Sequence, residues 1–214
     1  MTGGSGWTVL VPLRDLGGGK TRLSPCLSSA ERRELTAYAA AAVVTACKAA
    51  DSVARVVLVT GSSEASDWAA AAGVLAWSEP KGTLGLAAAM QAAVAAHSNA
   101  KSRVAVVMGD LPLANTAAIS RCLRRADARP VTLVPSRSGA GTNMLAFTGG
   151  AQIALALGAP DSLAQHRRAA QAAALRFQTV ASGPLALDVD DADDLRLLAQ
   201  VPAARRSLAF LGRF

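Results

Sequence analysis

The sequence is poor in the residues that build several common kinds of site. It has three cysteines, Cys26, Cys47 and Cys122, which are widely spaced and form no CxxC pair. It has two histidines, His97 and His166. An odd number of distant thiols with so few imidazoles excludes both a disulfide scaffold and a zinc site.

Aromatic residues are also scarce, at 4% of the chain, and the basic residues are scattered. Surfaces that bind nucleic acid usually combine clustered cations with aromatic rings on which bases stack. The sequence pI of about 10.2 is therefore a weak indication of nucleic-acid binding, and we expect no nucleic-acid partner. A non-catalytic basic RNA-binding domain stays open as the alternative from another class of function.

Long apolar segments are missing too. The most apolar stretches, such as residues 37–46, are rich in alanine and too short to span a bilayer. The first residues, MTGGSGWTVLVPLRD, have no basic start followed by a long apolar stretch, so they do not have the pattern of a secretory signal. We expect a cytoplasmic protein with no membrane partner.

The chain does have enough apolar surface for a core. Its 214 residues are 51% hydrophobic and 17% charged, which excludes intrinsic disorder and fits one domain over residues 1–214. Residues 1–6 and about 203–214 are expected to be frayed ends. The apolar residues 208–214 also suggest a contact between two copies of the chain in a homodimer.

Apolar β-branched runs alternate with alanine-rich helical stretches, which predicts an α/β fold with a mostly parallel mixed sheet and helices on both faces. Strands or extended segments are expected at residues 7–13, 55–60, 74–77, 103–108, 131–135, 144–148, 175–180 and 185–189. Helices are expected at about 28–49, 63–72, 84–97, 115–125, 162–174 and 191–198. In such sheets ligands bind beyond the carboxyl ends of the strands, so the loops there are the candidate site.

The loop after the first strand is rich in glycine and positive charge. It reads RDLGGGKTR and brings Arg14, Lys20 and Arg22 to a backbone that an anion can approach closely. It is not a P-loop, because that motif needs a glycine where Arg14 stands and opens directly into a helix. A phosphate-binding loop and a flexible surface turn are the two interpretations.

Carboxylates follow two later strands. Asp110 ends the strand before Leu-Pro, and it could hold Mg²⁺ or bond its own turn. Five of the 15 acidic residues lie between Asp188 and Asp194. In an extended segment Asp188 and Asp190 point the same way, and two adjacent carboxylates repel unless a cation lies between them, which favours a metal. Asp191 is expected to cap the next helix.

Two further segments suit anions. The loop Pro135–Asn143 combines glycines, hydroxyl side chains and Arg137, which makes it anion-receptive or an ordinary hairpin turn. Ser162 lies at a helix start, where backbone amides can receive a phosphate or carboxylate. His166 follows one turn later and is expected to be a satisfied helix residue rather than a catalyst.

Five segments, in this order, resemble the 2-phospho-L-lactate guanylyltransferase family, which includes relatives that use phosphoenolpyruvate or 3-phosphoglycerate and serves coenzyme F420 biosynthesis. The segments are VPLRDLGGGKTRLSP (11–25), GDLPL (109–113), PSRSGAGTN (135–143), PDSLAQH (160–166) and LALDVDDADDL (185–195). The resemblance implies a nucleotidyltransferase fold of the glycosyltransferase-A kind. It also implies transfer of GMP from GTP to the phosphate of a small phosphorylated acid, with release of pyrophosphate.

The same resemblance implies roles for individual residues. The metal ligands for Mg²⁺ would be Asp110, Asp188 and Asp190, and the catalytic residues Lys20 and Asp110. The nucleotide would be bound by Arg14, Lys20, Arg22 and Gly85. The acceptor would be bound by Thr142, Asn143, Gly158 and Ser162.

The chain departs from the family pattern at three places. The usual Phe-Gly-x-x-Ser is Gly158-Ala159-Pro-Asp-Ser162 here, so either Ala159 replaces the glycine or Gly158 serves after a one-residue shift. Gly85-Leu86 is followed by Ala87 instead of asparagine, and the usual Thr-Pro after Asp-x-Asp is Asp191-Ala192. A molybdopterin or sugar-phosphate nucleotidyltransferase is the alternative on the same fold.

Overall fold

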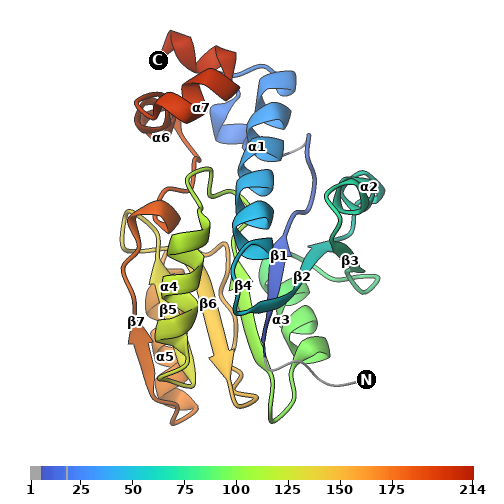
Figure 1. Cartoon of the computed structure of the whole chain (residues 1–214), viewed down its shortest axis with the longest axis vertical. Helices are drawn as coiled ribbons and strands as arrows, with labels where there is room; N and C mark the ends of the chain where they lie inside the picture. The colour runs from blue at the N-terminus through green and yellow to red at the C-terminus, as the bar shows by residue number, and fades with distance from the viewer. Residues whose placement is uncertain (1–5, 18) are drawn as a thin grey trace.

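The computed structural model describes residues 6–17 and 19–214 and shows one seven-stranded sheet with helices on both faces (Figure 1). Residues 1–5 of the expected frayed start, and Gly18, lie outside the described residues. The strands are β1 (Trp7–Pro12), β2 (Val53–Thr60), β3 (Leu75–Ser78), β4 (Arg103–Val107), β5 (Val131–Pro135), β6 (Thr142–Thr148) and β7 (Phe177–Thr179). The helices are α1 (Ser29–Lys48), α2 (Ser63–Ala71), α3 (Leu86–His97), α4 (Thr116–Ala126), α5 (Ser162–Ala172), α6 (Ala192–Ala199) and α7 (Pro202–Ser207), with 3-10 turns η1 (Thr21–Leu23), η2 (Gly183–Leu185) and η3 (Ala209–Arg213).

The strand order is β3-β2-β1-β4-β6-β5-β7. Neighbouring strands pair in parallel except where β6 lies between β4 and β5, so β6 alone among the described strands runs the opposite way. This confirms the expected mostly parallel mixed sheet. The reversed strand begins at the carboxyl edge of the sheet, which brings the start of β6 to the same edge as the loops after β1 and β4.

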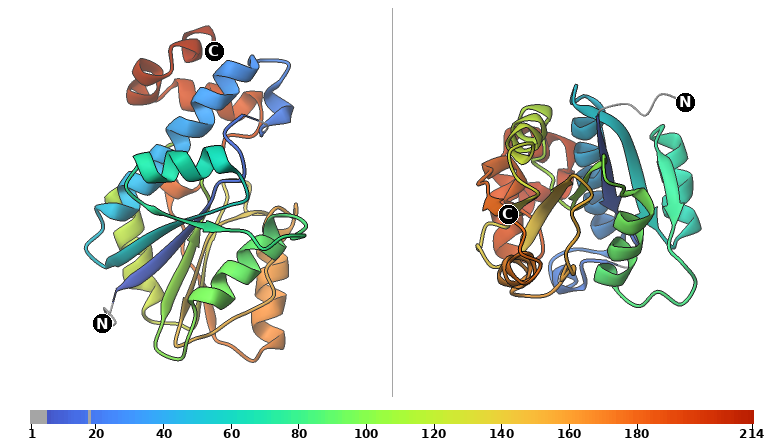
Figure 2. Two further views of the ribbon diagram at one scale, coloured as in Figure 1. Left: turned by 90° about the vertical axis from the view of Figure 1, so that its right-hand side faces the viewer. Right: turned by 90° about the horizontal axis from the view of Figure 1, so that it is seen from below.

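Two apolar cores cover the two faces of the sheet. Because successive strand residues face opposite sides, Val9 and Val11 pack with α1, α2 and α4, whereas Leu10 packs with α3 and α5. Figure 2 shows these helix layers on either side of the strands.

Side chains cap the first turns of two helices. Ser28 forms a capping box with Glu31 at the start of α1, and Asn115 accepts from the Ala118 amide at the start of α4. None of the helices in the described part of the chain is long and apolar enough to cross a membrane.

A third apolar cluster lies above the carboxyl edge of the sheet, where α6, α7 and η3 meet the start of α1 (Figures 1 and 2). It joins Leu23, Leu27 and Leu35 to residues from the end of the chain. The expectation of a frayed end at 203–214 is therefore wrong, because α7 and η3 fill this region. Leu208, Phe210 and Leu211 are buried in this cluster, so most of the apolar residues that suggested a homodimer contact pack within the chain, whereas Phe214 is exposed.

The expected extended segment 185–189 is not a strand of the sheet. Leu185 ends the 3-10 turn η2, and residues 187–190 have no regular secondary structure. The side-chain amide of Asn143 explains the difference, because it donates to the carbonyl oxygens of Leu185 at 2.9 Å and Ala186 at 3.1 Å. The carbonyl oxygen of Ala186 also accepts from the Arg137 amide at 2.8 Å, so this backbone is held by a long-range side chain and by the loop after β5.

Candidate active site

Five loops and the start of α3 line a cavity of about 580 Å³ at the carboxyl edge of the sheet, here the main cavity. The loops follow β1, β4 and β7, join β5 to β6, and lead from β6 to α5. The main cavity is lined by Lys20, Thr21, Arg22, Leu86, Met108, Asp110, Ser136, Ser138, Gly141, Thr142, Asn143, Gly158, Ala159, Pro160, Ser162, Asp188 and Asp190. One end of this wall is charged, and the other is built of hydroxyl and glycine residues.

Gly109 allows the ends of β1 and β4 to meet at the charged end. A Cβ atom there would lie 2.5 Å from the carbonyl oxygen of Pro12, which is closer than atoms can approach. The absence of a side chain lets β4 run on beside β1 and delivers Asp110 to the cavity. The sequence expectation that Asp110 emerges at a strand's carboxyl end agrees with this placement.

Lys20 lies at the centre of the charged end. Its backbone is left-handed, with φ 56° and ψ 41°, just before η1. Its side chain is only 7% exposed, and the ammonium nitrogen donates to the carbonyl oxygen of Val189 at 2.6 Å. The same nitrogen lies 3.6 Å from Oδ2 of Asp110 and 3.5 Å from Oδ1 of Asp190. Lys20 therefore joins the first loop to both acidic segments.

Asp110, Asp188 and Asp190 bring three carboxyl groups together in a partly buried place, which disfavours their ionised forms. Oδ1 of Asp110 is buried and has no hydrogen-bond partner. Burial raises the pKa of the Asp188 carboxyl, and the charge of Asp110 raises it further. Burial also raises the pKa of the Asp190 carboxyl, although the Lys20 charge acts in the opposite direction. Loss of water around the ionised carboxylates is thus the main cause of both raised pKa values, and neighbouring carboxylate charges add to it.

These carboxylates have the donor chemistry that Mg²⁺ prefers, and the partnerless Oδ1 of Asp110 is an oxygen that a cation could satisfy. As the side chains lie, no group of three or more His, Cys, Asp or Glu residues within the described ranges is gathered as a metal site. The cation that the structure does place between Asp110 and Asp190 is the Lys20 ammonium.

A smaller cavity of about 210 Å³ shares Lys20, Asp110 and Asp190 with the main cavity. Arg14 and Gly19 line it together with Leu13 and Thr36. Of the residues expected to bind nucleotide, Lys20 lines both cavities, Arg14 the smaller one and Arg22 the main one. Gly85 is exposed at the start of α3 and lines neither, although its neighbour Leu86 lines both.

At the polar end of the main cavity, Thr142 and Ser162 lie side by side. Ser162 Oγ donates to Thr142 Oγ1 at 3.3 Å, and both side chains are nearly buried. Gly158 also lines this end and has φ +87°, a conformation that favours glycine, so it and not Ala159 provides the glycine geometry of this loop. Thr142, Gly158 and Ser162 thus lie together as expected.

The helix start at Ser162 differs from the expectation that its amides would receive an anion. The Ser162 amide donates to the carbonyl oxygen of Ala159 at 3.1 Å, and the Leu163 amide donates to that of Ala140 at 2.9 Å. These donors are already engaged within the protein. The Ser162 hydroxyl, rather than the helix amides, is what this element offers to the cavity.

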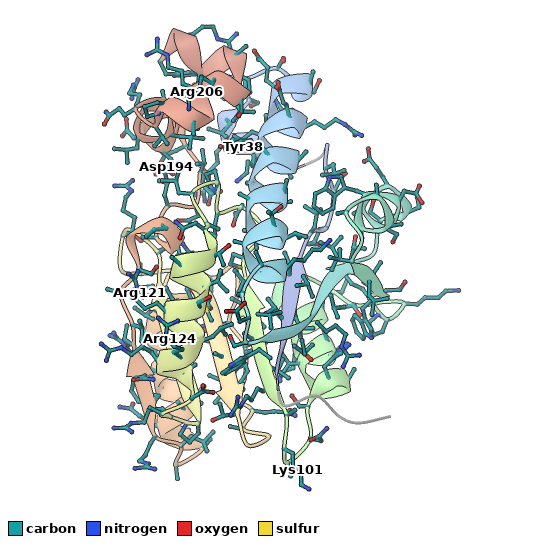
Figure 3. All side chains as sticks on the ribbon, viewed as in Figure 1. Tyr38, Lys101, Arg121, Arg124, Asp194 and Arg206 are labelled. Atoms are coloured by element: carbon teal, nitrogen blue, oxygen red, sulfur yellow. The ribbon has the colours of Figure 1, made fainter. Side chains whose placement is uncertain are left out.

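Two other expected anion or substrate contacts are occupied within the chain. Asn143 donates to the loop before Asp188 and to Oδ1 of Asp188 itself at 3.4 Å, so its amide nitrogen positions a carboxylate. Arg137 donates to Oδ1 of Asp194 at 2.8 Å, which corrects its assignment as an anion-binding side chain. Asp194 also accepts from the Asp190 amide at 3.1 Å, and it lies where α6 begins (Figure 3).

His166 is a satisfied residue of helix α5, as expected, but its contact with Thr142 was not expected. It is completely buried and contacts both Thr142 and the loop before Gly158, through Thr142 Oγ1 and the Ala156 amide. Burial lowers the pKa of its imidazole to about 4. Its spacing of four residues from Ser162 on one helix face was the available signal.

Comparison with solved structures defines the class of fold. A protein from Desulfovibrio desulfuricans G20, assigned as a nucleotide-diphospho-sugar transferase, matches with a TM-score of 0.76 at 16% identity over 97% of this chain and 94% of that one. CMP:2-keto-3-deoxy-manno-octonic acid synthetase, solved with CTP, matches with a TM-score of 0.58 at 14% identity over 91% and 99% of the two chains. The fold is that of this nucleotidyltransferase class, as expected.

Sequence comparison defines the family. Residues 7–212 match the model of the guanylyl transferase CofC like family, and the chain belongs to this family. Phosphoenolpyruvate guanylyltransferase of Streptomyces coelicolor is 37% identical over 97% of this chain and 96% of its own length. The 3-phospho-D-glycerate guanylyltransferase of Phenylobacterium zucineum is 32% identical over 91% and 90% of the two chains.

Proposed function

We propose that this protein transfers GMP from GTP to the phosphate of a small phosphorylated acid and releases pyrophosphate, in coenzyme F420 biosynthesis. Phosphoenolpyruvate, 2-phospho-L-lactate and 3-phosphoglycerate are the candidate acceptors, and two of them are named in similar guanylyltransferases. All three carry a phosphate and a carboxylate. A molybdopterin or sugar-phosphate acceptor is the alternative, since the fold alone does not select the acceptor.

One observation carries the proposal: Lys20, Asp110 and Asp190 line both the main cavity and the smaller one. A group transfer between two bound molecules needs a charged centre that both can reach. The smaller cavity, with Arg14 and Gly19, would hold part of the nucleotide on one side of this centre. The hydroxyl of Thr142, to which Ser162 donates, would hold the acceptor on the other side.

The chemistry requires little from side chains beyond positioning and charge. An oxygen of the acceptor phosphate forms a bond to the α-phosphorus of GTP, and the bond from that phosphorus to the bridging oxygen of the β-phosphate breaks. The leaving oxygen departs with pyrophosphate, whose added negative charge Lys20, Arg14 and Arg22 would offset. The acceptor phosphate is already ionised near neutral pH, so no general base is needed.

We also propose Mg²⁺ as the cofactor, held by Asp110, Asp188 and Asp190. When bound, it supplies Lewis-acid stabilisation of phosphoryl oxygens and a template for their alignment. The partnerless Oδ1 of Asp110 and the raised carboxyl pKa values of Asp188 and Asp190 support a cation at this place. Asn143 orients Asp188, and Asp194 holds the backbone of Asp190.

The test is pyrophosphate release by the purified protein with Mg²⁺ and GTP, supplied with each acid in turn and with ATP as the nucleotide control. Release with GTP and one acid establishes the reaction and its acceptor. Asp110→Asn, purified in parallel, identifies any contaminating activity. A folded protein that binds GTP but releases no pyrophosphate with any of the three acids contradicts the proposal.

A further inference from the structure

His166 lies behind the polar end of the main cavity, completely buried on α5. Both of its ring nitrogens are engaged. Nδ1 lies 3.0 Å from Thr142 Oγ1, and Nε2 lies 2.8 Å from the backbone nitrogen of Ala156. The histidine therefore connects the start of β6 to the loop that carries Gly158 to the cavity.

The Ala156 contact determines the tautomer. A backbone N–H can only donate, so Nε2 must be the ring nitrogen that carries the lone pair. The proton of the neutral imidazole is then on Nδ1, which donates to Thr142 Oγ1. The ring is neutral near pH 7 because burial lowers its pKa to about 4. The Thr142 hydroxyl oxygen therefore accepts a hydrogen bond from Nδ1–H of His166.

The Thr142 hydroxyl has one proton and two acceptor positions. One acceptor position takes Nδ1–H of His166, and the other takes the hydroxyl proton of Ser162. Both acceptor positions of the Thr142 oxygen are thus occupied, one by His166 and one by Ser162. The hydroxyl proton of Thr142 has to point elsewhere, and the main cavity is the open space that this side chain lines.

We infer that His166 is a positioning residue for the acceptor: it makes the Thr142 hydroxyl an obligatory donor directed into the main cavity. Such a donor favours a ligand group that only accepts hydrogen bonds, which is the chemistry of an ionised carboxylate or phosphate. It disfavours a hydroxyl or amide donor at the same place. This inference rests on the proposed function, which supplies an acceptor with both anionic groups.

Two substitutions separate the two hydrogen bonds of His166. His166→Asn keeps an N–H near the position of Nδ1 and loses the acceptor for Ala156. His166→Gln can keep an acceptor near the position of Nε2 and loses the donor to Thr142. We expect His166→Gln to raise the KM for the acceptor by about tenfold while the KM for GTP is unchanged, and His166→Asn to raise it less.

A double-mutant cycle tests whether His166 acts through Thr142. If it does, His166→Gln added to Thr142→Val raises the acceptor KM no further than Thr142→Val alone. Additive effects of the two substitutions, or an unchanged acceptor KM in His166→Gln, overturn the inference. His97→Gln is the matched control, because His97 lies on α3 and bonds the carbonyl oxygen of Ala93, away from the cavity.

A measurement without turnover keeps this inference separate from the proposed function. The chain has two histidines, so His97→Gln leaves His166 as the sole imidazole. Nitrogen-15 NMR of this variant is expected to show a neutral ring protonated at Nδ1. A ring protonated at Nε2 overturns the inference even if guanylyl transfer occurs. An Nδ1–H ring in a protein that transfers no GMP would mean that only the proposed function has failed.

Discussion

The ammonium nitrogen of Lys20 lies 3.6 Å from Oδ2 of Asp110, while the other oxygen of the same carboxylate is buried without a partner. Oδ2 of Asp110 is thus near the positive charge of Lys20, whereas Oδ1 is left able to bind a second cation. The same lysine reaches Asp190, so it shares its charge between two of the acidic groups at the charged end of the main cavity.

Replacing Lys20 with methionine keeps most of the unbranched apolar stem of the side chain and removes the charge. We expect Lys20→Met to lower kcat by roughly 100- to 1,000-fold, because charge developing on pyrophosphate would lose a preorganised cation. Pyrophosphate release measured under saturating substrates checks this. Lys101→Met is the control, since Lys101 is exposed at the opposite end of the molecule from Asp194 (Figure 3). Equal kcat in the Lys20→Met variant and the wild type would contradict the role.

The buried oxygen of Asp110 leads to a prediction about metal binding. Asp110→Asn should weaken Mn²⁺ binding, used as a paramagnetic probe for Mg²⁺, by at least about 10- to 100-fold. Electron paramagnetic resonance of free Mn²⁺ measures this without turnover. Asp193→Asn is the matched control, because Asp193 belongs to the same acidic segment but is exposed and pairs with Arg196. Equal Mn²⁺ affinity in the Asp110→Asn variant and the wild type would remove Asp110 from the proposed ligands.

Gly158 allows a test of backbone strain at the polar end of the main cavity. A Cβ there meets nothing closer than Leu86 Cδ2 at 3.8 Å, so Gly158→Ala has room, but its φ of +87° suits glycine. We expect this substitution to destabilise the fold by about 1–2 kcal/mol and to raise the acceptor KM. Urea unfolding and steady-state kinetics measure the two effects. Gly212→Ala, at an open position without a positive φ, should change neither.

Buried His166 makes stability depend on pH. Its pKa is about 4 in the folded chain and about 6.5 when unfolded, so the unfolded state binds more protons between these values. Stability is therefore lost as the pH falls through this range, by about 2 kcal/mol between roughly pH 7.5 and pH 5. Urea unfolding at the two pH values measures the loss. His166→Gln should remove this part of the dependence, and an unchanged pH slope in that variant would contradict it.

Local patterns in the sequence were enough to predict much of the fold and part of the candidate site. The run RVAVVM followed by Gly-Asp predicts a buried strand that delivers Asp110, and Ser28 with Glu31 predicts the start of α1. Asp188 and Asp190 also line the expected cavity.

Contacts between residues far apart in the chain were not predictable in this way. Arg137 suits an anion, but it pairs with Asp194, 57 residues later. The side-chain amide of Asn143 donates to the backbone carbonyl oxygens of residues 185 and 186, which lie 42 and 43 positions later in the chain. The expected loose end of the chain is buried because Leu208 and Phe210 meet Leu23 and Leu35, and no local pattern contains that information.

The third apolar cluster has a consequence for the order of events during synthesis. Lys20 precedes one of its members, Leu23, while Asp188 and Asp190 flank another, Val189. The ion pair between Lys20 and Asp190 therefore joins segments that are made far apart in time. During translation all seven described strands are made before Asp190 is. A nascent chain can thus begin to pair its strands while the charged end of the main cavity is still incomplete.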